Sequence, residues 1–201
     1  MTGIQKFYLY FGEARLGIII LAAGLGERFK QAGGQGNKLL AQQRNGQPLL
    51  ALTLQQAKRS GLPLLLVTRP DYPDILALAR QYQVPAITLV SNGSGESIAA
   101  GVQQTRAWPG WLIQPGDMAW VTAQDHRRVA TALADGAQQV RLCWQQQPGH
   151  PVGFARGYGE ALSRLSGDNG ARTLLDPAIL KTLNAHAGVI RDADLPVINR
   201  S

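Results

Sequence analysis

Two basic residues that follow a glycine-rich segment are the first chemical signal in this sequence. Residues 21–26 read LAAGLG, and Arg28 and Lys38 come after them. Small side chains let backbone N–H groups approach a ligand closely, and an arginine fork with a lysine point charge suits a polyphosphate. By residue type alone, the segment is equally consistent with an ordinary strand-to-helix turn in which both cations are exposed in a loop and solvated. It lacks the third glycine of the dinucleotide fingerprint and the G-K-[ST] of a P-loop.

Later segments also carry side chains that could do chemistry. Asp117 lies in a Pro-Gly-Asp-Met turn, where its carboxylate could bind Mg²⁺ or only shape the turn. Gly95 and Ser97 lie in a polar segment between a strand and a helix, where open α/β sheets place ligands. His150 and Arg172 lie in glycine-containing segments that, taken alone, indicate plain turns.

Hydrophobic patterning predicts the elements that position these residues. Apolar runs predict strands at residues 16–21, 64–67, 86–90, 111–114 and 137–144, and a last strand in the tail, 188–196, ending in acidic residues. Helices are expected at 47–58, 71–82, 98–106 and 122–133, the last capped by Thr122, and again around residues 174–175. Because strands and helices alternate, we expect a single Rossmann-like three-layer α/β domain with a mostly parallel central sheet.

Length, charge and cysteine content narrow the class of protein. The 201 residues suffice for one domain, which we assign to 16–201, after an N-terminal extension of unknown structure at 1–15. No apolar run reaches the length of a membrane span, and the single cysteine agrees with a cytoplasmic protein. The net charge of +7 would suit nucleic acid, but the basic residues are dispersed and no nucleic-acid motif accompanies them. We therefore expect small anionic substrates, with no nucleic-acid or membrane partner.

Five segments, in order, resemble the motifs of the nucleotidyltransferases that include the molybdenum-cofactor cytidylyltransferases. LAAGLGERF and NKLL are similar to LAAGxSxRMGxxK, with a longer loop and with Phe29-Lys30 in place of Met-Gly. PGDM is similar to LGDMP, GHPV occurs at 149–152, and GDNGAR is similar to GDxGAR. DADLP is similar to the beginning of the closing motif DIDTPED, but Leu195 replaces the threonine and Val197-Ile198 the final acidic pair. The resemblance covers about residues 16–196.

This resemblance implies a Mg²⁺-dependent enzyme, with Mn²⁺ as an alternative ion, that transfers a cytidylyl group from CTP to the phosphate of molybdopterin, the pterin of the molybdenum cofactor. A molybdoenzyme would then receive the product. The roles that the resemblance implies are catalysis for Arg28, Lys38 and Asp117, metal binding for Asp117 and Asp194, nucleotide binding for Leu21, Ala22, Ala23, Gly24, Gly26, Gly95 and Ser97, and acceptor binding for His150 and Arg172.

Three alternatives remain at this stage. The nucleotide could be GTP, although the Ala22-Ala23-Gly24 run resembles cytidylyl enzymes more than guanylyl ones. The acceptor could be a sugar phosphate, although the GHP and GDxGAR matches favour a pterin. The chain could also be a non-catalytic carrier or insertion chaperone of the cofactor, because its closing motif is altered. Transfer to a phosphate oxyanion needs positioning and charge neutralisation rather than a general base. The lack of a convincing Ser-His-Asp set in the sequence therefore favours transfer.

Overall fold

The β-branched apolar segments form the interior of a sheet that has seven strands in the part of the chain the structure describes. This computed structural model describes residues 15–26, 31, 33 and 35–192. Strand β1 (Gly17–Ala22) lies between β2 (Leu64–Thr68) and β4 (Gly110–Pro115), and β3 (Ala86–Thr88) follows β2 at the edge. These four strands run parallel to one another. The isoleucines at 18–20 are fully buried, as expected for a parallel strand that is covered on both faces.

The other half of the sheet contains an antiparallel strand. β6 (Gln147–Ala155) lies antiparallel between β4 and β5 (Gln139–Trp144), and β7 (Leu180–Asn184) pairs parallel with β5 at the second edge. The strand order is β3-β2-β1-β4-β6-β5-β7. The expectation of a mostly parallel sheet is therefore confirmed.

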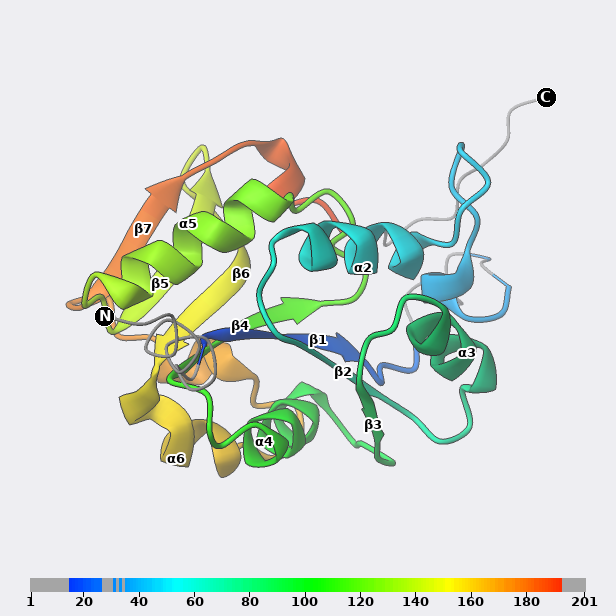
Figure 1. Ribbon diagram of the computed structural model, residues 1–201, viewed down its shortest axis with the longest axis horizontal. Coiled ribbons are helices and arrows are strands. Elements are labelled where there is room, and N and C mark those ends of the chain that lie inside the picture. Colours follow the sequence, from blue (N-terminus) through cyan, green and yellow to red (C-terminus); the bar gives the residue numbers. More distant parts are fainter. Residues whose placement is uncertain (1–14, 27–30, 32, 34, 193–201) are drawn as a thin grey trace, which may run out of the picture.

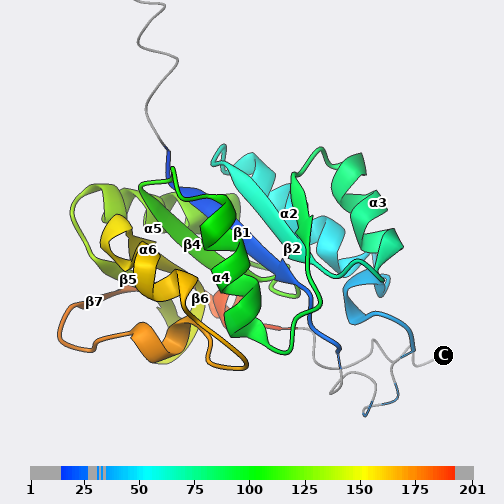
Figure 2. The same cartoon turned by 90° about the horizontal axis from the view of Figure 1, so that it is seen from below.

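Helices cover both faces of the sheet (Figures 1 and 2). α2 (Leu49–Arg59), α3 (Pro73–Gln81) and α5 (Ala123–Ala134) lie on one face, and α4 (Ser94–Gln104) and α6 (Gly159–Ser163) lie on the other. Each face has its own apolar cluster, with Leu54 and Val129 in the first and Ile98 and Leu162 in the second. This arrangement confirms the three-layer α/β fold class. Among the described residues, no helix combines the length and the apolar character needed to cross a membrane.

Four local expectations were wrong. Helix α4 begins at Ser94 rather than Ile98, so that Gly95 and Ser97 lie in its first turn. His150 lies within strand β6 and not in a turn, because residues 147–155 pair with both β4 and β5. In place of a helix around residues 174–175, the chain forms the short 3-10 helix η3 (Ala171–Leu174).

The fourth difference concerns the end of the chain. Residues 187–189 form the 3-10 helix η4 (Ala187–Val189) at the start of the strand expected at 188–196, and the last strand of the described chain is β7. Residues 193–196 of that expectation lie outside the described residues. β7 is polar and mostly exposed, with the sequence LKTLN, and it therefore lacks the apolar run that marks a buried strand. The expected capping of α5 is confirmed, because Asp125 N donates to Thr122 Oγ1.

Candidate active site

The carboxyl ends of β1 and β4 border a pocket of about 800 Å³, a volume typical of small-molecule sites. It brings together most of the candidate residues, although they span 130 positions of the sequence. Those that line it are Leu21, Ala22, Ala23, Gly24, Gly26, Lys38, Ser97, Asp117 and His150. Gly95 and Arg172 are not among its lining residues in the described part of the chain. Arg28 and Asp194 lie outside the described residues.

The glycine-rich segment leaves β1 and forms one wall of this pocket. Thr68 Oγ1 donates to Ala22 O at 3.1 Å, and the Tyr72 hydroxyl donates to Gly24 O at 3.2 Å. Gly26 has φ of 64°, in the left-handed region that a residue with a Cβ adopts only with strain. The segment is therefore shaped by hydrogen bonds from β2 and from the loop before α3, while its small side chains leave its backbone accessible from the pocket.

Lys38 and Asp117 form an ion pair across the pocket. Lys38 begins the 3-10 helix η1 (Lys38–Leu40), which Asn37 caps by accepting a hydrogen bond from Leu39 N. Lys38 Nζ lies 2.6 Å from Asp117 Oδ2, and the two side chains are 15% and 14% exposed. Of the two interpretations left open by residue type, the one in which Lys38 is exposed and solvated in a loop was therefore wrong. The pair joins residues 79 positions apart, and it links the loop after β1 to the turn after β4.

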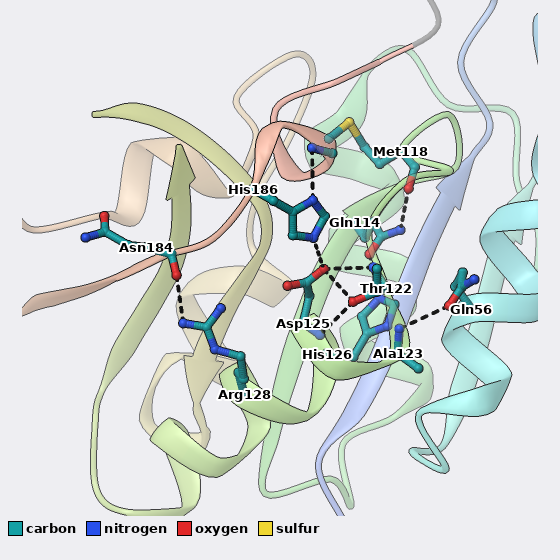
Figure 3. Close-up of polar contacts among 11 residues, drawn as sticks. Gln56, Gln114, Met118, Thr122, Ala123, Asp125, His126, Arg128, Asn184 and His186 are labelled. Carbon is teal, nitrogen blue, oxygen red and sulfur yellow. Dashed lines mark hydrogen bonds and ion pairs between the residues drawn. The ribbon is translucent and has the colours of Figure 1, made fainter. Parts of the chain in front are cut away.

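A second carboxylate, Asp192, also lines the pocket. Two contacts hold the segment before it: His186 Nε2 lies 2.9 Å from Asp125 Oδ2, and the Arg191 guanidinium lies 3.8 Å from the centre of the Trp120 ring. Figure 3 shows the first of these contacts at the start of α5. Sequence reasoning selected Asp194 and missed Asp192, although the Asp-Ala-Asp spacing offered both carboxylates.

The carboxylates that line the pocket suit a hard divalent cation whose remaining coordination positions are filled by substrate and water. Among the described residues, no group of three or more His, Cys, Asp or Glu side chains is arranged to hold a metal ion. Mg²⁺ commonly takes only one or two protein carboxylates and fills its shell with phosphate oxygens and water. Asp117 and Asp192 could supply those carboxylates. In this structure the Lys38 ammonium provides the positive charge beside Asp117.

The start of α4 packs tightly against the loop that contains the GDNGAR motif. Gly95 N donates to Gly167 O at 2.9 Å, and a Cβ on Gly95 would lie 2.5 Å from Asn169 O. Gly95 therefore allows backbone to approach backbone. Ser97 does line the pocket, but its buried hydroxyl donates to Ser91 Oγ at 3.1 Å.

His150 is electrically neutral at pH 7. Its pKa is lowered to about 4, mainly by burial and also by the charge of Arg141, while the charge of Asp117 opposes the shift. Burial also lowers the pKa of Arg141, and the nearby charge of Arg172 adds to this effect. The charge of Arg141 thus acts on His150, and that of Arg172 acts on Arg141. Neither arginine is among the residues that line the pocket.

Arg69 is a pocket residue that sequence reasoning missed. It immediately follows β2, and its side chain is only 12% exposed. Its Nε lies 3.0 Å from Asp71 Oδ1, and its Nη1 donates to Ser91 O at 3.4 Å. The available signal was its place after a parallel strand, since the carboxyl ends of such strands share one edge of the sheet.

Comparison with known proteins supports a nucleotidyltransferase. Residues 18–187 match the model of the MobA-like NTP transferase domain. No curated protein matches the sequence significantly. Among solved structures, Rv0371c of Mycobacterium tuberculosis H37Rv has a TM-score of 0.77 at 22% identity, covering 92% of this chain and 95% of its own. A second structure of Rv0371c, in complex with manganese, has a TM-score of 0.71 at 20% identity, covering 85% of this chain and 88% of its own.

A nucleotidyl transferase from Methanothermobacter, Mth528, has a TM-score of 0.73 at 18% identity, covering 88% of this chain and 89% of its own. At these identities the solved structures show a shared fold, whereas the family match extends over most of the sequence. The chain therefore belongs to the family of MobA-like NTP transferase domains and is a nucleotidyltransferase.

Proposed function

We propose that this protein transfers the cytidylyl group of CTP to the terminal phosphate of the pterin in the molybdenum cofactor, and releases pyrophosphate. The main support is one observation: a single pocket gathers the glycine-rich segment, Lys38, Asp117 and His150, which belong to motifs far apart in the sequence. We place the reaction in the cytoplasm, with a molybdoenzyme as the recipient of the product.

The nucleotide triphosphate would lie against the glycine-rich wall. Accessible N–H groups of residues 22–26 and the Lys38 ammonium would neutralise its phosphates, with Arg28 as a further cation. Mg²⁺ held by Asp117, and by Asp192 or Asp194, would stabilise charge on the α-phosphate and the leaving pyrophosphate. The manganese complex of Rv0371c supports the use of a divalent ion on this fold.

The acceptor would approach from the His150 side of the pocket. Its attacking group is already a phosphate oxyanion, so that neutral His150 need only orient it and no proton has to be removed. Arg141 does not line the pocket, but its charge acts on His150 and would favour an anionic acceptor beside that residue.

The direct test is incubation with molybdenum cofactor, Mg²⁺ and each nucleoside triphosphate in turn, with products identified by mass spectrometry. We expect the cytosine dinucleotide form of the cofactor, with CTP strongly preferred, because a site that hydrogen-bonds one base leaves polar groups unpaired with another. Equal or better use of GTP would overturn the cytidylyl assignment and leave nucleotidyl transfer in place. Absence of transfer with every triphosphate would favour a cofactor carrier.

A further inference from the structure

The main-chain carbonyls of Gly116 and Met118, the residues on either side of Asp117, each accept a hydrogen bond from a buried side chain. Thr53 Oγ1, on α2, donates to Gly116 O at 2.7 Å. Gln114 Nε2, at the end of β4, donates to Met118 O at 3.3 Å. Both donors are fully buried. The turn that carries Asp117 is therefore held on both sides of the carboxylate by groups that do not face the pocket.

A third buried residue fixes the orientation of Gln114. His126 Nε2, on α5, lies 2.7 Å from Gln114 Oε1 (Figure 3). The Met118 carbonyl can only accept a hydrogen bond, so Gln114 must turn its amide nitrogen to Met118 and its oxygen to His126. His126 Nε2 must then carry the proton and donate it. The hydrogen bonds run in one direction, from α5 through Gln114 to the turn.

The protonation state of His126 agrees with this direction. Its Nδ1 is buried and has no hydrogen-bond partner among the described residues, so nothing there stabilises a second proton. Burial lowers the pKa of His126 to about 4. The imidazole is therefore neutral at pH 7 and protonated on Nε2, which is the form that the bond to Gln114 requires.

These three polar residues lie among apolar ones. Leu54 and Ile113 are adjacent in the chain to Thr53 and Gln114, Val129 is one helical turn after His126, and all three are buried. The hydrogen bonds of Thr53 and Gln114 satisfy main-chain carbonyls, so both side chains contribute to stability. Because the two bonds end on the turn beside Asp117, they also restrict how that turn can move.

We propose that Thr53, Gln114 and His126 are positioning residues that hold the Asp117 carboxylate in the geometry needed to bind the divalent cation. The inference rests on the proposed function, which places the cation at Asp117. The Gly116–Asp117 peptide plane and the Met118–Ala119 plane are held on either side of the carboxylate, which restricts the turn that carries it. Residues that orient a metal ligand through hydrogen bonds typically change metal affinity by about 10- to 100-fold when they are replaced.

The sharpest test compares two substitutions at one position. Thr53→Val keeps the shape of the side chain and removes the hydroxyl, whereas Thr53→Ser keeps the hydroxyl and removes the methyl group. We expect Thr53→Val and Gln114→Leu each to weaken Mn²⁺ binding about tenfold or more, measured in the presence of CTP by electron paramagnetic resonance of free Mn²⁺. Thr53→Ser should stay within about twofold of wild type, since it retains the hydrogen bond to Gly116.

Thr105→Val is the matched control. Thr105 Oγ1 donates to Gly101 O at 2.7 Å and is also buried, but it follows the end of α4 and accepts from Trp111, near the start of β4. This variant loses the same kind of bond away from Asp117, and its Mn²⁺ affinity should match that of wild type. The KM for CTP at saturating metal should change little in Thr53→Val, because Thr53 is not among the residues that line the pocket.

The outcomes separate this inference from the proposed function. Wild type that binds Mn²⁺ and releases pyrophosphate, together with a Thr53→Val variant of unchanged affinity, would overturn the positioning role and leave the function standing. A Thr105→Val variant that loses as much Mn²⁺ affinity as Thr53→Val would also overturn it. Wild type that binds no Mn²⁺ would overturn both. If Gln114→Leu does not fold, the Thr53 pair decides the question.

Discussion

Replacing Lys38 by methionine should destabilise the protein when no metal ion is present. The change removes the ammonium 2.6 Å from Asp117 Oδ2 and leaves a carboxylate whose side chain is only 14% exposed. Hydrogen bonds to charged groups contribute about 1.5–3 kcal/mol, so we expect a loss of about 2 kcal/mol. For a chain of this length, that corresponds to a fall in Tm of about 4–8 °C. Calorimetry in the presence of a chelator measures it.

The Asp117→Asn background tests whether the loss comes from the ion pair. Removing both charges leaves no carboxylate at position 117 to be compensated, so Lys38→Met should cost less there than in wild type. Arg164→Met is the surface control, because Arg164 and Glu160 pair at 2.6 Å with side chains 75% and 73% exposed. That exposed pair should contribute less than about 1 kcal/mol. A Lys38→Met variant whose Tm lies within about 1 °C of that of wild type would contradict the role given to the ion pair. An equal loss of stability from Lys38→Met in the wild-type and Asp117→Asn backgrounds would contradict it as well.

Two further predictions concern packing and pH. Gly95→Ala should cost about 1–3 kcal/mol in urea denaturation, because its Cβ would lie 2.5 Å from Asn169 O, whereas Gly24→Ala, with nothing within 4 Å of its Cβ, should leave stability unchanged. The pKa of His126 is about 4 in the folded protein, below its ordinary value of 6.5. The contribution of neutral His126 to the free energy of unfolding is therefore fully present above pH 6.5 and is lost as the pH falls towards 4. His126 alone should account for about 2 kcal/mol between pH 7.5 and pH 5, a difference that His126→Leu should remove.

The parts of the fold that depend on local patterning could be predicted from the sequence. Alternating apolar strands and amphipathic helices led to the parallel half of the sheet, and Thr122 marked the start of α5. Most candidate residues meet in one pocket because many of them follow parallel strands, whose carboxyl ends share an edge of the sheet.

The remaining features depend on pairing between distant segments. β6 lies between β4 and β5, and nothing within residues 147–155 signals this placement, since the segment reads as a proline- and glycine-containing turn. Polar β7 is a strand because β5 offers an edge to pair with. The Lys38–Asp117 pair joins two loops 79 positions apart, so that neither the burial of Lys38 nor its charge partner could be read from its neighbours.

The most direct test of the proposed function is pyrophosphate release by wild type and by Asp117→Asn, with Mg²⁺, CTP and molybdenum cofactor supplied together and with each omitted in turn. We predict release by wild type only when all three are present, and almost none by Asp117→Asn, because one carboxylate supplies a large part of the protein's share of the metal site. Undiminished release by Asp117→Asn would contradict the metal site. Release with CTP and Mg²⁺ but without the cofactor would contradict the proposed acceptor.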